Sequence, residues 1–440
     1  MNRRLFLSAS AAALAGCSSG GTNFAPHALP AAPFYTRLEV AEFSRDAALV
    51  GAFRDGVRAM MAIQDPRDVR SWYYWHHVHH MSKGMPPAAY AAVWNQCKHH
   101  RVPYFYAWHR GFVYFFEKTI RAMSGNQRFA LPYWDYYRHP EIPAIFAEPQ
   151  LPDGTPNPLY WRDRTGQRIT GLNFASYGAK TFPNSRIYSF EDLLEINPHG
   201  HVHDQVGGDM GHIPTAALDP IFYAHHCNVD RLWSAWVDAG AGRHMPAAGS
   251  AYYDRSFAYD LSQSWSLGVA AMVDTIPLGY TFRDLGLPVA PAGAALPARP
   301  AVVAALGTLG LEPVSIEVPL ENPASWSAGP ELVLRGVELT PLGARGGFAI
   351  RIYAGLPQSA PPVAEDSRYS VGEAGPFGIS AAQMAGMGGS PSEAVDLRYP
   401  LPPQAPGATT VTVSFVASGA PSGVPPGAAL LRIGGIFATA

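Results

Sequence analysis

The sequence predicts a mainly α-helical domain built on a four-helix bundle, followed by a smaller all-β sandwich domain. After residue 312, apolar and polar residues alternate in short runs separated by Gly and Pro, which is typical of strands. The first part instead shows apolar residues at helical spacing, clearest at Val113, Phe116 and Ile120. Four predicted helical segments carry histidines there and are expected to converge as a bundle: residues 72–80, 108–123, 198–206 and 219–238.

The chain divides into five predicted regions. Residues 1–17 are expected to be a signal peptide, and residues 18–35, rich in Ser, Gly, Ala and Pro, a tether. The helical domain is assigned to residues 36–285, a Pro/Ala-rich linker to 286–312, and the β-sandwich to 313–440. With 440 residues, of which 48% are hydrophobic, the chain is large and apolar enough for two folded domains, which excludes global disorder.

The N-terminus has the features of an export signal. Arg3 and Arg4 precede an apolar run that, at about a dozen residues, is well short of the ~20 that span a bilayer. The paired arginines resemble a twin-arginine signal, and the segment ending in Cys17 resembles a lipoprotein cleavage box. We therefore expect export to the periplasm or cell envelope, with membrane attachment only through a lipid on Cys17. An ordinary signal without lipid is the alternative.

The charge and the histidines narrow the function. The net charge is −2 and no basic run occurs, so we expect no nucleic-acid partner. Of the 16 histidines, 14 lie between residues 76 and 226. Neutral imidazole is the usual protein ligand for copper and zinc, and three imidazoles per metal leave a coordination position open for a small substrate. The sequence therefore predicts that one region carries metal chemistry.

The spacing of some histidines predicts their geometry. His199 and His203 are four residues apart, so on a helix both rings leave the same face. Asn197 and Pro198 predict the start of that helix, as its N-cap and its first helical residue. His201 lies between the two rings in sequence and points away, so we expect it to be a polar surface residue.

Other histidines leave choices open. His100 and His109 are nine residues apart, half a turn out of phase on a helix, and Pro103 lies between them. We therefore expect His100 on a loop and His109 at a helix start. A further ligand is expected from a run with four candidates, His76, His77, His79 and His80, and the adjacent His225 and His226 offer a similar choice.

These stretches resemble the coupled dinuclear type-3 copper family: tyrosinases, catechol oxidases and other polyphenol oxidases. Phe129–Asp135 (Phe-Ala-Leu-Pro-Tyr-Trp-Asp) and Val206–Met210 are also similar to that family. The resemblance implies that the helical bundle surrounds two copper ions, that O2 is the oxidant, and that o-diphenols are oxidised to o-quinones. Phe348–Pro357 and Ile433–Ile436 are similar to the C-terminal domain of plant polyphenol oxidases, which can cover the copper cleft of a latent enzyme.

The resemblance also implies a ligand set. The family pattern that begins at Ser71-Trp72 selects His79, with His80 and His76 as alternatives. The pattern around Asp219-Pro220 selects His226 and leaves His225 a packing or outer role. The expected ligands of one copper are thus His79, His100 and His109, and those of the other are His199, His203 and His226.

Three further positions carry expectations. Glu195, four residues before His199, matches a family carboxylate that holds a water and helps to deprotonate an incoming phenol. Gly200 stands where many members that hydroxylate monophenols have Asn, so diphenol oxidation is the safer prediction. Cys97 is one residue out of register with the cysteine that forms a thioether to a copper ligand in some members, so a buried thiol is the alternative.

Other activities remain open from the sequence. A tyrosinase that hydroxylates monophenols and an o-aminophenol oxidase would use the same site. A hemocyanin-like oxygen carrier would use the copper pair without turnover. A zinc hydrolase is a different class, but neither histidine helix carries the His-Glu-x-x-His of a zinc protease. The oligomeric state and the physiological phenol have no signature in the sequence.

Overall fold

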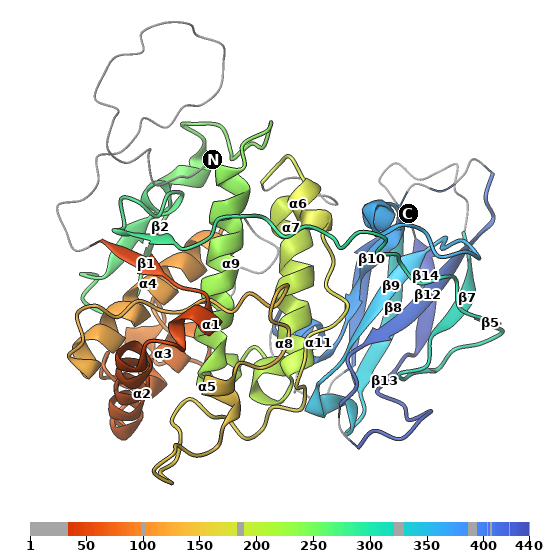
Figure 1. Cartoon of the computed structure of the whole chain (residues 1–440). Helices are drawn as coiled ribbons and strands as arrows, with labels where there is room; N and C mark the ends of the chain where they lie inside the picture. Colours follow the sequence, from red (N-terminus) through yellow and green to blue (C-terminus); the bar gives the residue numbers. More distant parts are fainter. Residues whose placement is uncertain are drawn as a thin grey trace, which may run out of the picture.

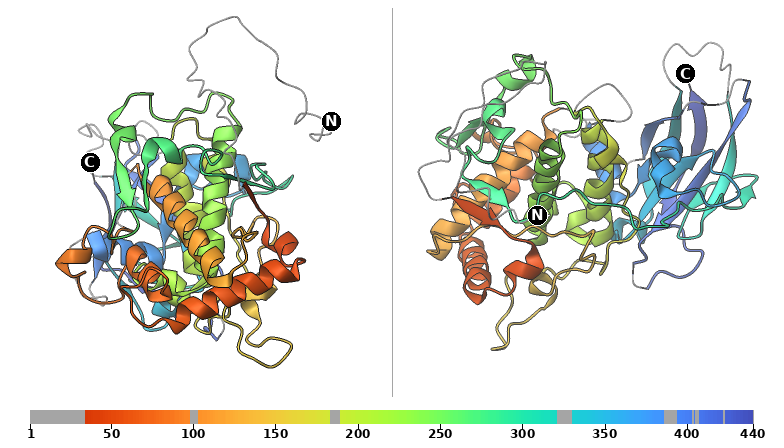
Figure 2. Two further views of the ribbon diagram at one scale, coloured as in Figure 1. Left: turned by 90° about the vertical axis from the view of Figure 1, so that its left-hand side faces the viewer. Right: turned by 45° about the horizontal axis from the view of Figure 1, so that its top comes forward.

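The computed structural model describes residues 34–97, 103–182, 189–320, 330–385, 394–402, 404, 407–421 and 423–439 (Figures 1 and 2). The predicted signal peptide, Cys17 and His100 lie outside these residues. Within them, a mainly helical region and a strand-rich region lie side by side, at the left and right of Figure 1. No helix of the described part combines the length and the apolar character needed to cross a bilayer.

The helical region is built around two long helices, α4 and α9, packed against each other. Its α-helices are α1 (Val40–Phe43), α2 (Ala47–Ala62), α3 (Trp72–His79), α4 (Phe105–Ser124), α5 (Ala144–Ala147), α6 (Ala175–Gly178), α7 (Phe190–Leu194), α8 (His201–Val206) and α9 (Ile221–Asp238). A π-helical turn, η3 (Glu195–Gly200), joins α7 to α8.

Local sequence signals fix several helix ends. The Asp46 carboxylate accepts hydrogen bonds from the backbone N–H groups of Ala48 and Leu49, and so caps the start of α2. Ser71 caps α3 in the same way. Gly125 ends α4 with a φ of 70°, a left-handed conformation that glycine adopts without a side-chain clash. These ends place the histidines of α3 and α4 at fixed positions.

The predicted helix at 198–206 differs from the structure in one respect. Asn197 has an extended backbone (φ −147°, ψ 116°), as an N-cap would, and the helical turns follow it. Its side chain does not cap them, however. It accepts from the backbone N–H of Asn173 and donates to Gly171 and to the Glu373 carboxylate. Contacts distant in sequence therefore take the place of the local cap.

A buried network of ion pairs connects α4 and α9. Arg37, at the end of strand β1 (Tyr35–Arg37), donates to Glu117 of α4 (2.9 Å) and to Asp230 of α9 (2.8 Å). Arg110 binds the other oxygen of Asp230, and Arg121 binds the other oxygen of Glu117. Asp230 is only 4% exposed, so it is a buried partner of these arginines and not a surface charge.

Asp230→Ala is expected to lower the free energy of unfolding by about 3–5 kcal/mol, because Arg37 and Arg110 would stay buried without their counter-charge. Urea denaturation followed by circular dichroism measures the loss. The matched control is Asp55→Ala, which breaks an ion pair whose side chains are 49% and 64% exposed, and it should cost less than ~1 kcal/mol. Equal losses for both variants would mean that the network contributes no special stability.

The strand-rich region contains two five-stranded sheets. One has the order β10-β9-β12-β7-β5, and the other has the order β11-β8-β13-β6 with β14 also paired to β8. The strands are β5 (Val302–Val303), β6 (Thr308–Leu309), β7 (Val314–Pro319), β8 (Glu331–Leu339), β9 (Ala349–Ala354), β10 (Ser370–Ala374), β11 (Val395–Pro400), β12 (Thr410–Ser418), β13 (Leu431–Arg432) and β14 (Gly435–Thr439). In the helical region β4 (Tyr280–Phe282) pairs with β1, and β2 (Ser256–Ala258) pairs with β3 (Ser266–Gly268).

Apolar side chains of both five-stranded sheets form one core. Leu332 and Leu334 of β8 belong to the same buried cluster as Ile350 and Ile352 of β9 and Val413 of β12. The region is not all-β, however, because α10 (Asp366–Tyr369) and α11 (Pro376–Ala385) lie among its strands. Their segments show no strand alternation, and their sequence pattern predicts no helix either.

The two regions meet at a junction where backbones approach closely. The N–H of Gly347 donates to the carbonyl of Asp204 (2.8 Å), and the N–H of Phe377 donates to the Asp204 carboxylate (2.6 Å). A Cβ added at Gly346 would lie 2.7 Å from the Cα of Gly207, and one at Gly375 would lie 2.3 Å from an Asp204 oxygen. At Gly346, where the contact is with backbone, only glycine fits, whereas a Cβ at Gly375 would displace the Asp204 carboxylate. The junction thus places α11 directly beside α8.

Candidate metal centre

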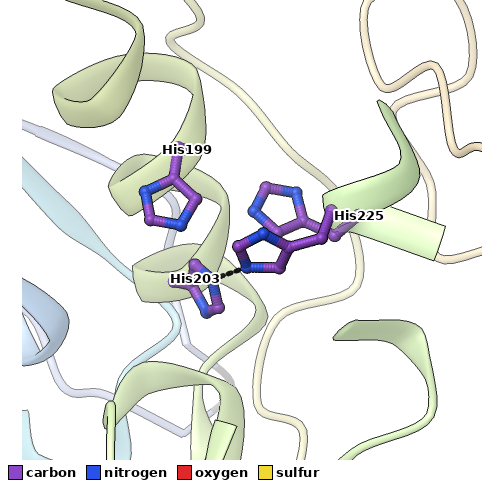
Figure 3. Close-up of side chains that lie close together, drawn as sticks. His199, His203 and His225 are labelled. Carbon is purple, nitrogen blue, oxygen red and sulfur yellow. Dashed lines mark hydrogen bonds between the residues drawn. The ribbon is translucent and has the colours of Figure 1, made fainter. Parts of the chain in front are cut away.

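Two groups of buried side chains provide candidate metal ligands. The first group contains His79, which ends α3, His109 of α4, and Cys97. The second contains His199 of η3, His203 of α8, and the neighbours His225 and His226 of α9. Within each group the possible ligand atoms all lie within 4.8 Å of one another. In Figure 3 the rings of His199, His203 and His225 point toward one another from two segments of the chain.

The two groups adjoin. The rings of His109 and His226 stack with centroids 4.4 Å apart and planes 13° apart. Phe105 lies against His109 (4.3 Å between centroids) and His199 (4.6 Å). Imidazoles from four separate segments therefore meet in one buried space, as a dinuclear centre requires.

Backbone carbonyls orient three of the rings. Nδ1 of His109 lies 2.8 Å from the carbonyl oxygen of Phe105. Nδ1 of His199 lies 3.2 Å from that of Glu195. Nδ1 of His203 lies 2.8 Å from that of Met210. An Nδ1–H that donates to a carbonyl leaves Nε2 as the nitrogen with the lone pair, which is the usual arrangement in metal sites. Nε2 of His203 lies 3.3 Å from Nε2 of His226.

These observations fit a bound cation. If Nδ1 of His203 donates its proton to the carbonyl of Met210, Nε2 of the same ring carries no proton and is an acceptor. This acceptor faces Nε2 of His226. Burial, together with the neighbouring imidazoles, lowers the pKa of His226 well below its usual value, so its ring is neutral and able to bind a metal. In the described part of the chain, neither ring nitrogen of His225 has a hydrogen-bond partner. The donor set is therefore rich in unprotonated nitrogen, which suits copper or zinc.

The structure brings together five of the six predicted ligands. The sixth, His100, lies outside the described residues, so no contact can be assigned to it. Of the alternatives to His79, His76 bonds to Ser82 and His80 to the carbonyl of Met81, and neither belongs to the histidine groups. His225 lies in the same group of possible ligands as His199, His203 and His226. The choice of His226 over His225 as the ligand stays a prediction.

The cysteines lie in separate places. Cys97 Sγ is 3.6 Å from Nε2 of His109, so the thiol position borders the candidate centre. Cys227 is buried on the far side of α9, with Sγ 3.7 Å from the carbonyl of Leu131. No disulfide joins them. The thioether stays untested because the expected partner, His100, is not described.

One expectation for this region is wrong. His201 was expected at the surface, but it is fully buried, with Nδ1 2.7 Å from the Glu373 carboxylate and Nε2 bonded to the carbonyl of Thr170. The local pattern correctly turns His201 away from His199 and His203. It does not reveal that the C-terminal region covers that side of the helix.

Acidic side chains lie just before the histidines. Glu195 is buried in the first turn of η3, and its role with an incoming phenol stays a prediction. Glu191 lies one turn earlier, in α7. No sequence pattern singles it out, because acidic residues are common in short helices. Its carboxylate accepts from the backbone N–H of Phe105, the first residue of α4. Burial, and secondarily Glu195, raises the pKa of Glu191 well above its usual value.

Glu191 is expected to make stability depend on pH. Because its pKa is higher in the folded than in the unfolded chain, the unfolding free energy falls as pH rises above ~4.3, by up to ~1.4 kcal/mol per unit, until the raised pKa is passed. Glu191→Gln should flatten this decline in urea titrations between pH 5 and pH 8. The exposed Glu312→Gln should leave it unchanged. Parallel pH profiles for wild type and Glu191→Gln would contradict the assignment.

A phenylalanine of the strand-rich region covers the second histidine group. Phe377, in α11, stacks on His203 with ring centroids 4.1 Å apart and planes 14° apart. It also packs edge-on against His199 at 5.4 Å. Its backbone is held by Asp204, whose pKa burial raises well above its usual value. No local pattern indicates this contact, because Phe377 is 174 residues after His203.

The fold and the paired histidine groups define a dinuclear metalloprotein with a C-terminal region beside its centre. Residues 69–186 and 162–239 match the family model for the common central domain of tyrosinase. The chain is 30% identical over 337 residues to a tyrosinase from Hahella sp. (strain CCB-MM4), covering 65% of this chain and 68% of that protein. It therefore belongs to the tyrosinase family, whose members are copper oxidoreductases with a dinuclear copper site.

Plant proteins are also similar. The chain is 27% identical over 315 residues to the aureusidin synthase of Antirrhinum majus, covering 59% of this chain and 54% of that protein. It is 29% identical over 225 residues to a chloroplastic polyphenol oxidase of Malus domestica, covering 42% of this chain and 38% of that protein. The matched part thus spans only about half or less of these plant proteins.

Two solved structures share the fold of both regions. Latent apple tyrosinase superposes with a TM-score of 0.57 at 22% identity, covering 94% of this chain and 98% of the other. Latent aurone synthase superposes with a TM-score of 0.54 at 19% identity, covering 94% of this chain and 92% of that one. At these identities the likeness concerns the fold, which includes the helical core and the strand-rich part.

Proposed function

We propose that this protein is a copper-dependent polyphenol oxidase that oxidises o-diphenols to o-quinones with O2. The observation that carries the proposal is the meeting of two buried histidine groups, stacked through His109 and His226, in a chain of the tyrosinase family. When bound, the copper pair supplies the redox chemistry. The protein supplies the ligands, their orientation and a buried aromatic surrounding.

The proposed ligands are those of the sequence analysis: His79, His100 and His109 for one copper, and His199, His203 and His226 for the other. The carbonyl contacts of His109, His199 and His203 support the assignment, because they leave Nε2 of each ring available to a metal. His225 is the alternative to His226, since it offers ring nitrogens in the same group.

Glu195 is proposed to accept the proton of the incoming phenol. A phenol has a pKa of ~10 and binds a metal better as phenolate, so a nearby carboxylate helps binding at neutral pH. Gly200, next to His199, offers no side chain to support a water there, which favours diphenols over monophenols. A Cβ at this position would lie 3.6 Å from the Phe377 ring, so Gly200 also borders the covered side of the centre.

The substrate preference is tested on copper-loaded protein. We expect catechol to be oxidised at least about tenfold faster than tyrosine or o-aminophenol, a difference of ~1.4 kcal/mol in barrier. Absorbance of the quinone and O2 uptake measure the rates. Faster turnover of o-aminophenol would favour the o-aminophenol oxidase. An absorption band that forms on exposure to O2 and persists when catechol is added would favour an oxygen carrier.

The finer architecture is also proposed. The histidine-bearing α3, α4, α8 and α9 are proposed to form a four-helix bundle around the copper pair, and residues 313–440 a β-sandwich whose two sheets share one core. Phe377 is proposed to limit access to the centre from that region.

Export is proposed through the signal at residues 1–17, with a lipid on Cys17 that anchors the protein in the cell envelope. Arg3, Arg4 and the segment ending in Cys17 support this proposal. Cys17→Ser should move the protein from the membrane fraction to the soluble fraction. An unchanged distribution would contradict the anchor.

A further inference from the structure

A buried acid joins two helices that lead into the candidate centre. Glu191, in α7, is only 3% exposed, and its carboxyl accepts a hydrogen bond from the backbone N–H of Phe105, the first residue of α4. The backbone carbonyl of Glu191 accepts from the hydroxyl of Tyr106 at 3.3 Å, although the two residues are 85 positions apart. Glu191 therefore binds the start of α4 twice, through its side chain and through its main chain.

The side-chain contact supplies what the start of α4 lacks locally. The first N–H groups of a helix have no partner within the helix, and a side chain at the N-cap position usually accepts from one of them. The N-cap residue of α4, Tyr104, makes no such side-chain hydrogen bond. Glu191 thus takes the place of a local cap and fixes the first turn of α4 to α7.

Phe105 passes this constraint to candidate ligands in both halves of the centre. Its carbonyl oxygen lies 2.8 Å from Nδ1 of His109 and so orients that ring. Its own ring contacts both His109 and His199, with centroids 4.3 and 4.6 Å away. His109 is a proposed ligand of one copper and His199 of the other. The position of Phe105 therefore bears on the spacing between the two halves.

The other end of the contact leads to the second half along the chain. α7 continues directly into η3, where the carbonyl of Glu195 lies 3.2 Å from Nδ1 of His199. Because Glu191 lies one turn before Glu195, holding Glu191 against α4 also holds the turn that orients His199. The rings of His109 and His199, 6.4 Å apart between centroids, are thus tied to each other through Glu191.

The carboxyl of Glu191 accepts without needing a charge. Its Oε1 atom is buried and has no hydrogen-bond partner among the described residues, which is costly for an ionised group. Burial raises the pKa of Glu191 well above its usual value and so favours the neutral carboxyl. A neutral amide accepts in the same way, whereas a thioether is only a weak acceptor.

We propose that Glu191 is a positioning residue of the copper centre, which sets the spacing between the imidazoles of its two halves by holding Phe105. It acts through Phe105 and through the turn at Glu195, and not on the substrate. The proposal rests on the proposed function, since it takes His109 and His199 as ligands of different copper ions.

Three variants of Glu191 test the proposal in the full-length, copper-loaded protein. Glu191→Met fills the same space but accepts poorly. Glu191→Asp keeps the acid but draws it back from the N–H of Phe105, and Glu191→Gln keeps both the length and an acceptor. The matched control is Asp366→Leu, in α10 of the strand-rich region. Asp366 is also a buried acid with a raised pKa, and one of its oxygens likewise has no partner in the described part of the chain.

The main readout is the EPR spectrum of the oxidised protein. Two Cu(II) ions joined by one bridging oxygen atom couple their spins and give no signal, whereas separated ions give one. We expect no signal from wild type, Glu191→Gln or Asp366→Leu, a strong signal from Glu191→Met and a weaker one from Glu191→Asp. Copper affinity, measured by competition with a chelator, should fall about 10–100-fold in Glu191→Met, the range for loss of a group that orients metal ligands. Thermal unfolding is measured in parallel.

Several outcomes would overturn the proposal. A lower melting temperature of Glu191→Met without an EPR signal would mark Glu191 as purely structural. Equal signals in Glu191→Gln and Glu191→Met would reject the hydrogen bond to Phe105 as the cause, and a signal in Asp366→Leu would show that loss of any buried acid has this effect. If Glu191→Met does not fold, the comparison of Glu191→Asp with Glu191→Gln decides. Wild type that binds fewer than two copper ions, or two uncoupled ones, would instead reject the proposed function, and this proposal with it.

Discussion

Replacing His203 or His226 with alanine is expected to remove copper from one half of the centre and to abolish oxidase activity. Each ring occupies the crowded second group, where Nε2 of His203 faces Nε2 of His226 at 3.3 Å. Loss of outer-shell partners alone costs metal sites about 10–100-fold, so loss of a ligand should reduce activity by ~100-fold or more. Copper content by atomic absorption should fall from two ions per chain toward one.

The control for these variants is His139→Ala, whose side chain is 53% exposed and lies outside both histidine groups. It should retain full copper content and activity. His225→Ala separates the two neighbours on α9: we expect it to keep both copper ions if His226 is the ligand. Normal copper content in both His203→Ala and His226→Ala would reject the ligand set.

Phe377→Ala is expected to raise the activity on catechol, because it removes the ring stacked on His203 while keeping the backbone N–H that binds Asp204. The effect should appear mainly as a lower KM, since access to the centre is what changes. Steady-state kinetics measure it. Phe437→Ala, which shortens a 44% exposed ring in the same region, is the control and should have unchanged kinetics.

Deleting residues 303–440 tests the same cover more drastically. If that region acts only as a cover, activity should rise further than in Phe377→Ala. Insoluble protein would instead make the region a structural support, a role to which the buried Glu373–His201 pair would contribute. Unchanged kinetics in Phe377→Ala would contradict the covering role of the ring, whatever the deletion does.

The sequence predicted those features that depend on short spacings. The i, i+4 pair of His199 and His203 lies on one side of its helix, and His109 lies near the start of α4. The alternating runs beyond residue 312 became strands of two sheets. These predictions succeeded because periodicity acts over a few residues, where the sequence itself contains all the partners.

What the sequence did not reveal depends on partners far along the chain. His201 is buried because Glu373, 172 residues later, covers it. Phe377 reaches His203 only because the junction aligns α11 with α8. The carboxylate of Glu191 meets the start of α4 through the packing of separate helices. Neither propensity nor spacing encodes such contacts, so they require the folded chain.

The glycine contacts at the junction have a consequence for the evolution and engineering of this chain. Gly346 and Gly375 leave room for hydrogen atoms only, against Gly207 and Asp204. A single methyl group at Gly346 is expected to push the C-terminal region away from α8, and with it the ring of Phe377, and one at Gly375 to displace the carboxylate that holds the Phe377 backbone. A single added carbon atom at Gly346, more than 30 residues before Phe377 in the sequence, is thus expected to shift the ring that packs on His199 and His203.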